Sequence, residues 1–154
     1  MPFYSASDFY PDSSLGYLAR RVFQISTVGL EPVFEPEGIT LTHWLALVSI
    51  HLNPGSTCAD LARDIAHDKG ATTRLIDALV ERSWVERDRD GADRRVVKLS
   101  LTDAGEAVAQ RARLKVMARW NAWLADWSNE DAAELVRLLQ KLHTTLADAS
   151  EDGA

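Results

Sequence analysis

The sequence has few of the features that secreted, membrane and metal-binding proteins require. Its one cysteine, Cys58, cannot form an internal disulfide, which favours a reducing compartment. No apolar run approaches the ~18 residues of a membrane span, and the N-terminus lacks the basic and apolar regions of a signal peptide. The four histidines include no i, i+4 pair, so no metal site is expected. We therefore expect a cytoplasmic protein without a membrane segment, metal or cofactor.

Motifs of the common enzyme classes are also missing. The chain has no Gly-x-Ser-x-Gly elbow, no Walker loop and no dinucleotide-binding glycine pattern. No motif ties a histidine to the single cysteine as a catalytic partner. The sequence therefore favours a binding protein over an enzyme.

Basic residues are in the minority, and the net charge of −6 argues against a general attraction to phosphate. Residues 63–98 depart from this balance with nine bases and eight acids, which leaves a net charge of −7 on the rest of the chain. Strand alternation over residues 85–90 would place Arg87 and Arg89 on one face and three acids on the other. We expect the fold to direct its arginines towards a nucleic acid; the alternative is a weak affinity for nucleic acid.

Residues 56–102 predict two short helices followed by a charged hairpin. Ser56 or Thr57 can cap the first helix, and Asp60 lies at the position that completes a capping box. Asp68 is the expected cap of the second helix. The buried face of that helix is predicted from apolar residues at helical spacing: Leu75, Ile76, Leu79 and Val80. The residues that mostly fall outside this stripe, where a partner could meet them, are Thr72, Thr73, Arg74, Asp77 and Arg82.

After Trp84 the apolar period changes from helical to alternating. Val85 begins one expected strand, and a second runs from Val97 to Leu101 across a turn at 90–93. The whole segment is thus expected to be a helix-turn-helix followed by a two-stranded wing.

Two further helices are expected before this segment. The first begins at Asp12 or Ser13, and the pairs Glu31-Pro32 and Glu35-Pro36 are expected to kink or end it. The second is capped by Thr40 and stops at residues 53–55.

Two more helices are expected after the wing. Thr102 caps a long helix that includes Trp127, and residues 128–131 end it and cap the last helix. The first and last helices of the chain are too apolar to stand alone, so each needs a partner surface. The expected fold class is mostly α (α+β), with about six helices and a two-stranded β-wing.

Several segments in this order resemble the MarR family (multiple-antibiotic-resistance regulators) of bacterial transcription factors. The matching segments are Ala59-Asp60-Leu61-Ala62, residues 73–79, Val85-Glu86-Arg87, Asp93-Arg94-Arg95 and residues 101–105. The most specific part is Asp93-Arg94-Arg95 followed, at the family's distance, by Leu101-Thr102 and Gly105. The resemblance covers roughly residues 13–147.

The resemblance implies one MarR-like domain over residues 1–154 that functions as a homodimer. Residues 1–38 and 103–148 would form the dimerisation helices, and residues 39–102 the winged helix-turn-helix lobe. Such a dimer would be a sequence-specific regulator of transcription, in this family more often a repressor. It would bind a palindromic operator in double-stranded DNA, with half-sites about 34–36 Å apart.

The resemblance and the expected helix-turn-helix together predict a set of DNA-binding residues. They are Lys69, Thr72, Thr73, Arg74, Arg87, Asp93, Arg94 and Arg95. Arg74 is expected to contact a base edge or a phosphate, and the alternative is a surface pair with Asp77 or Asp68.

The wing supplies the remaining contacts in this prediction. Arg94 or Arg95 would reach the minor groove, where the potential attracts guanidinium groups, and Asp93 would orient one of them. The alternative is a solvated hairpin tip. Arg87 is expected either to contact a phosphate or to brace the wing through an ion pair.

One residue departs from the family pattern. The family usually has a glycine after the second helix of the motif, where a left-handed residue ends it, and this chain has Ser83. Keeping that conformation would cost about 1 kcal/mol.

The resemblance also implies a small effector, often an aromatic carboxylate, that releases DNA. The candidate binding residues are Tyr17, Arg21, Phe23, His43 and Trp44. An arginine beside aromatic rings suits a carboxylate, and the alternative is core packing with a surface arginine.

Two other functions stay open at this point. Cys58 could act as a redox sensor, because a thiol at a helix N-terminus can be reactive, or it could be a buried inert cysteine. The acidic balance leaves room for a protein-interaction module on the same scaffold that has lost its affinity for DNA.

Overall fold

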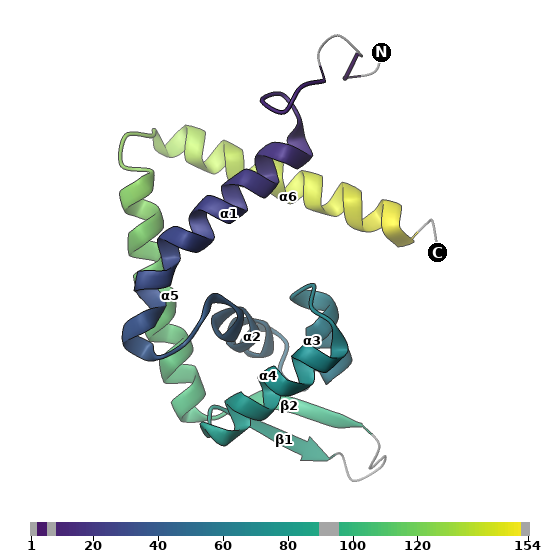
Figure 1. Ribbon diagram of the computed structural model, residues 1–154, viewed down its shortest axis with the longest axis vertical. Coiled ribbons are helices and arrows are strands. Elements are labelled where there is room, and N and C mark those ends of the chain that lie inside the picture. Colours follow the sequence, from purple (N-terminus) through teal and green to yellow (C-terminus); the bar gives the residue numbers. More distant parts are fainter. Residues whose placement is uncertain (1–2, 6–8, 90–95, 152–154) are drawn as a thin grey trace. The chain divides into compact units, whose positions relative to one another are not determined.

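The computed structural model describes residues 3–5, 9–89 and 96–151, and these form six α-helices, one 3₁₀-helix and two strands (Figure 1). In order they are α1 (Leu15–Phe34), η1 (Glu35–Glu37), α2 (Leu41–Leu52), α3 (Cys58–Asp64), α4 (Lys69–Glu81), β1 (Val85–Arg89), β2 (Val97–Leu101), α5 (Asp103–Trp123) and α6 (Asn129–Glu151). The predicted fold class, mostly helical with a two-stranded wing, is confirmed. The chain divides into two compact units, residues 1–116 and 117–154, which are described separately.

The first helix begins later than expected. Its N-cap is Ser14, whose hydroxyl accepts the backbone N–H of Tyr17 at 3.4 Å. The prediction of Asp12 or Ser13 is wrong, because the Ser13 hydroxyl is engaged with the backbone of Tyr10 in the preceding turn. The helix also continues through Pro32, so only the second proline pair ends it, where the chain turns into η1.

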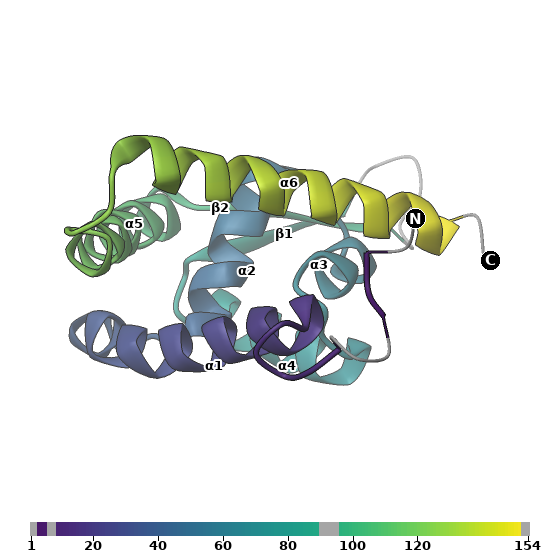
Figure 2. The same cartoon turned by 90° about the horizontal axis from the view of Figure 1, so that it is seen from above.

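The core of the first unit is built around α2, in which Ala46, Leu47 and Ile50 have no exposed surface. Figure 2 shows α1 and α2 crossing at a steep angle, so that only the end of α1 enters this core. The same buried cluster takes residues from every other element of this unit except η1, among them Phe34, Leu61, Ile76, Leu79, Val85, Leu99, Val108 and Ala112. A capping box fixes the start of α2, since Thr40 N–H donates to His43 Nδ1 at 3.1 Å and His43 N–H donates to the Thr40 hydroxyl at 3.3 Å.

The helix-turn-helix caps follow the sequence prediction. Thr57 and Asp60 form a reciprocal capping box at the start of α3, and the hydrogen bond from the Thr57 hydroxyl lowers the pKa of Asp60. Asp68 caps α4 by accepting the N–H of Ala71 at 2.8 Å, which lowers the pKa of Asp68. Both helices therefore begin where a side chain satisfies a backbone donor.

Both helices of the motif end with a left-handed residue that is not glycine. Ala66 has φ 51° after α3, and Ser83 has φ 57° after α4. At each end, two hydrogen bonds from the residues past the helix satisfy its last carbonyls, as in a Schellman motif. For α4 these run from Ser83 N to Val80 O at 2.8 Å and from Trp84 N to Leu79 O at 3.0 Å. The chain therefore keeps a left-handed residue at the end of α4 although Ser83 stands there.

Replacing Ser83 with glycine should raise the free energy of unfolding. A side chain at positive φ costs about 1–2 kcal/mol, and the extra freedom of glycine in the unfolded chain offsets part of it, so we expect a net gain of about 0.5–1 kcal/mol. Urea unfolding at one fixed protein concentration measures it. Ser83→Ala is the control, since it removes the hydroxyl and keeps the strain. A glycine variant that is less stable than wild type would contradict the prediction.

The wing is a two-stranded antiparallel sheet in which Val85 pairs with Leu101 and Arg87 with Leu99. Residues 55–56 form hydrogen bonds with the backbone of β2. Gly55 N–H donates to Leu99 O at 2.8 Å, and Leu99 N–H donates to Ser56 O at 2.9 Å. Val85 and Leu99 are buried, whereas the acids of β1 are exposed. Arg87 is exposed as well, so burial does not separate the arginines from the acids, and the predicted sorting of charges stays a prediction; Asp90 and the side chain of Arg89 lie outside what the structure describes.

The second unit contains the end of α5 and α6. The long helix stops at Trp123, so the prediction that Trp127 belongs to it is wrong; instead, Trp127 N–H bonds to Leu124 O at 2.9 Å in a turn. The Ser128 hydroxyl then accepts the N–H of Asp131 at 3.0 Å and begins α6. Within the described ranges, no helix is both long and apolar enough to cross a membrane.

Candidate nucleic-acid interface and ligand cavity

The first two turns of α4 present an exposed polar face. Lys69, Gly70, Thr73 and Arg74 are exposed, while Leu75, Ile76 and Leu79 turn into the core on the opposite side. Backbone N–H groups at a helix N-terminus carry partial positive charge, which favours an anion. This face is therefore suited to phosphate or to a base edge.

Thr72 is not part of that face. Its side chain is completely buried, and its hydroxyl donates to the backbone carbonyl of Asp68 at 2.8 Å. The expectation that Thr72 meets a partner is wrong, because the hydroxyl is satisfied inside the helix and its methyl group can pack in the core. Thr73 is exposed, although its hydroxyl also bonds within the helix, to the carbonyl of Lys69 at 2.9 Å.

Arg74 has no hydrogen bond or ion pair with any of the described residues. Of the two acids that the sequence offered as alternatives, Asp77 pairs with Arg87 and Asp68 caps the helix; the Arg74 charge contributes to the lowered pKa of Asp68, but no hydrogen bond or ion pair joins the two side chains. The exposed guanidinium of Arg74 is therefore available to a ligand of opposite charge.

Arg87 connects the wing to α4. Its Nη2 lies 2.6 Å from Asp77 Oδ1, and 37% of its side chain is exposed. Of the two roles expected for Arg87, the structure shows the bracing ion pair. The pair also neutralises the acid in the middle of the exposed face of α4.

Arg82, expected from the sequence to lie outside the apolar stripe of α4 where a partner could meet it, makes contacts within the chain instead. It donates to the carbonyl of Gly38 at 2.6 Å, and its guanidinium lies 4.9 Å from the ring centroid of Trp84. Partial burial lowers the pKa of His43, and the nearby Arg82 charge lowers it further. Arg82 thus joins the end of α4 to the loop before α2. The remaining predicted DNA-binding residues, Asp93, Arg94 and Arg95, lie outside the described residues.

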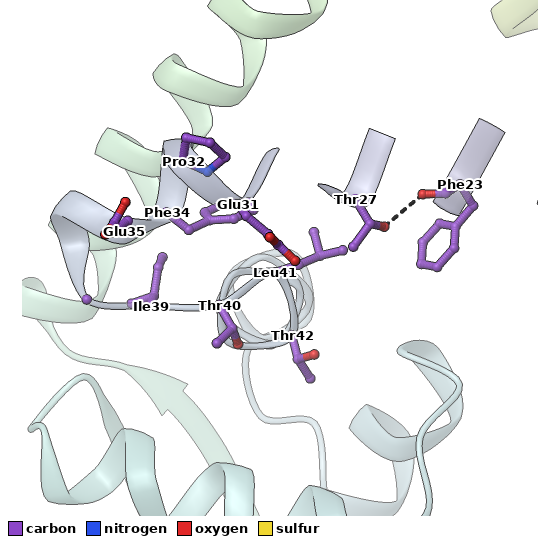
Figure 3. Close-up of a pocket in the computed structure, with 11 residues that line it drawn as sticks. Phe23, Thr27, Glu31, Pro32, Phe34, Glu35, Ile39, Thr40, Leu41 and Thr42 are labelled. Carbon is purple, nitrogen blue, oxygen red and sulfur yellow. Dashed lines mark hydrogen bonds between the residues drawn. The ribbon is translucent and has the colours of Figure 1, made fainter. Parts of the chain in front are cut away.

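A cavity of about 920 Å³ lies between α1, η1 and α2 (Figure 3). Its lining residues are Phe23, Thr27, Glu31, Pro32, Phe34, Glu35, Gly38, Ile39, Thr40, Leu41 and Thr42. Of the lining residues from α1, Phe23, Thr27 and Glu31 are four apart, and that i, i+4 spacing is a signal in the sequence that could have identified this wall.

Of the five residues predicted to bind an effector, only Phe23 lines this cavity. His43 belongs to the cap of α2, and Trp44 packs against Phe34 with ring centroids 5.8 Å apart. Tyr17 is exposed on α1. Arg21 lies at a shallower depression on α1 and donates to Gln24 Oε1 at 3.4 Å.

Cys58 is the first residue of α3 and is half-buried. Its Sγ lies 3.7 Å from the Thr73 hydroxyl, so the thiol touches the exposed face of α4. No group of three or more metal-binding side chains occurs in residues 3–5, 9–89 and 96–151.

Comparison with known proteins identifies the scaffold. A sequence model of the MarR family matches residues 39–97. The crystal structure of wild-type MarR from E. coli in its apo form is 30% identical, with a TM-score of 0.75 over 84% of this chain and 96% of that chain. The chain belongs to the MarR family. This family comprises transcription regulators rather than enzymes.

Two other solved MarR family structures carry partners. A cysteine-to-serine mutant of E. coli MarR was crystallised with operator DNA; it is 30% identical, with a TM-score of 0.72 over 83% of this chain and 92% of that chain. The Mycobacterium tuberculosis MarR family protein Rv2887 was crystallised with salicylic acid; it is 30% identical, with a TM-score of 0.73 over 85% and 97% of the two chains.

Proposed function

We propose that this MarR family protein is a homodimeric repressor that binds a palindromic operator through α4 and the wing, and that a small molecule modulates its affinity. The observation that carries the proposal is the exposed N-terminal face of α4, where the Arg74 side chain makes no hydrogen bond or ion pair with any described residue. The E. coli relative that was crystallised with operator DNA supports it.

Exposed apolar side chains support a dimer. On α1 they are Leu15, Tyr17, Leu18, Val22, Phe23, Ile25 and Val28, and on α6 they are Leu135, Val136, Leu138, Leu139 and Leu146. A lone soluble chain rarely exposes so many large apolar groups, and a second copy would cover them. The proposed dimerisation segments are residues 1–38 and 103–148, which precede and follow, in the sequence, the lobe formed by residues 39–102.

The contacts with DNA follow from the geometry of α4. Its N-terminal turns would enter the major groove, with Arg74 donating two hydrogen bonds to a guanine edge or binding a phosphate. Lys69 would contact a phosphate, and the Thr73 hydroxyl would donate a hydrogen bond to a phosphate or pair with a base edge as donor or acceptor. From the wing, Arg94 or Arg95 would reach the minor groove, with Asp93 orienting the guanidinium.

The cavity between α1, η1 and α2 is the proposed effector site. A relative of this chain, Rv2887, was crystallised with salicylic acid, which supports a small-molecule ligand for this protein too. Because Gly38 lines the cavity and accepts a hydrogen bond from Arg82 at 2.6 Å, an occupant could shift the end of α4. Repression would then be relieved by release of DNA.

Fluorescence anisotropy tests the proposed function. Full-length protein is titrated into labelled DNA from its own upstream region and into shuffled DNA of the same length and composition. We expect binding to the upstream DNA to be tighter by about 10³-fold or more. Equal affinities for the two duplexes would contradict a sequence-specific regulator.

The ion pair between Asp77 and Arg87 gives a prediction about charge on the recognition face. Arg87→Ala leaves the Asp77 carboxylate facing phosphate, so we expect the operator affinity to fall by about fivefold, or ~1 kcal/mol. Removing both charges in Asp77→Ala/Arg87→Ala should restore the affinity to near the wild-type value. Anisotropy titrations of the three proteins measure this. If the double variant stays as weak as Arg87→Ala, Arg87 contacts DNA directly and bracing is not its main role.

A further inference from the structure

The charged side chains that line the cavity between α1, η1 and α2 are all acidic. Its walls are largely apolar, with contributions from Phe23, Phe34, Ile39 and Leu41. The only charged side chains among the lining residues are two carboxylates, and no lysine, arginine or histidine lines the cavity. A ligand held here would meet apolar walls and negative charge.

Glu31 is the first of these two acids in the chain. Figure 3 shows its side chain extending from α1 towards Leu41 at the start of α2, across the space that the cavity occupies. Glu35 lies one turn further along the same wall. Within the part of the chain that the structure describes, neither carboxylate has a hydrogen bond or ion pair, so both are available to a ligand.

We propose that this cavity binds an amphipathic cation, with an aromatic or aliphatic body against the apolar walls and a protonated amine at Glu31. The proposal rests on the effector site proposed above and specifies its ligand class. It differs in charge from the acid that was crystallised with Rv2887. A carboxylate in this cavity would face two lining acids, while the guanidinium of Arg82 beside the lining residue Gly38 is engaged by the Gly38 carbonyl at 2.6 Å; like charges therefore disfavour binding of the carboxylate.

The alternative for an acidic ligand is the neighbouring depression on α1. It is lined by Arg21, Phe23, Gln24, Ile25, Thr27 and Val28, and it shares two of these residues with the cavity. An acid bound there would depend on Arg21 and be insensitive to Glu31. The two sites therefore make opposite predictions for the same pair of variants.

Isothermal titration calorimetry without DNA distinguishes binding in the cavity from binding in the depression on α1. The probes are 1-naphthylmethylamine, 1-naphthylmethanol and 1-naphthoic acid, which share a ring system and differ in charge. We expect the amine to bind full-length protein at least about tenfold more tightly than the acid, with the alcohol in between. Glu31→Gln should reduce the affinity for the amine to about that for the alcohol, and Glu35→Gln should have a smaller effect.

Glu86→Gln is the matched control, because it removes the same charge from the exposed face of the wing and should leave all three affinities unchanged. The proposal is overturned if none of the probes binds at millimolar concentration, or if Glu31→Gln leaves amine binding intact. It is also overturned if the acid binds most tightly and loses its affinity in Arg21→Ala. Since no DNA is present, failure here is distinct from failure of the proposed regulation, and thermal unfolding of each variant checks that it is folded.

Discussion

Gly105→Ala should lower the free energy of unfolding by about 3 kcal/mol or more, or prevent folding altogether. A Cβ at position 105 would lie 2.0 Å from the carbonyl oxygen of Trp84, which is far inside van der Waals contact. That carbonyl cannot easily withdraw, because it accepts the N–H of Thr102 at 3.1 Å. The Thr102 hydroxyl in turn accepts Gly105 N–H at 3.0 Å and donates to Ser83 O at 2.6 Å. An added methyl group would therefore separate the start of α5 from the end of α4 and from the wing.

Urea unfolding at a fixed protein concentration measures the effect. Gly16→Ala is the control, because a Cβ at position 16 meets no atom within 4 Å and alanine suits a helix better than glycine. The control should be as stable as wild type or slightly more so. If Gly105→Ala unfolds at the wild-type midpoint, the close contact with Trp84 does not exist in solution.

Arg74→Ala should have the largest effect of any single substitution on operator binding among the described residues. A bidentate contact to a base is worth about 1–3 kcal/mol of discrimination, so we expect the operator affinity to fall by about 10- to 100-fold. Specificity should relax at one base pair of each half-site if Arg74 contacts a base. If it contacts a phosphate, binding to all sequences should weaken alike.

Anisotropy titrations with the operator and with single-base variants of each half-site measure both quantities. Arg113→Ala removes the same charge from an exposed position on α5 and should change the affinity little. Equal losses in the two variants would show that net charge, and not the face of α4, governs binding.

The sequence predicted the local features of the fold well. The caps at Thr40, Thr57 and Asp68 involve side chains within three residues of the groups they satisfy, so their signals are short and specific. Thr72 was misplaced because the buried stripe of α4 was inferred from apolar residues alone. A threonine whose hydroxyl bonds to the carbonyl four residues earlier can be buried in the same stripe.

The cavity between α1, η1 and α2 was harder to predict, because it depends on which face of α1 turns towards α2. The candidates were chosen by residue type, and Arg21 was expected to bind a carboxylate, yet the structure lines the cavity with Glu31 and Glu35. The hydrogen bond between Arg82 and Gly38 joins residues 44 positions apart, and no local sequence pattern predicts a contact over that separation. Tertiary placement, and not composition, determines both features.

The salt dependence of operator binding tests the central claim most directly. Each phosphate neutralised by a cation releases counterions, so the logarithm of the association constant should fall with the logarithm of salt concentration with a slope of about −4 or steeper for a dimer. Binding to shuffled DNA should be weaker throughout. A steep slope with preference for the upstream DNA is the result that a regulator acting through α4 and the wing predicts. A flat slope with equal affinity for both duplexes would contradict it and favour a protein partner for this scaffold.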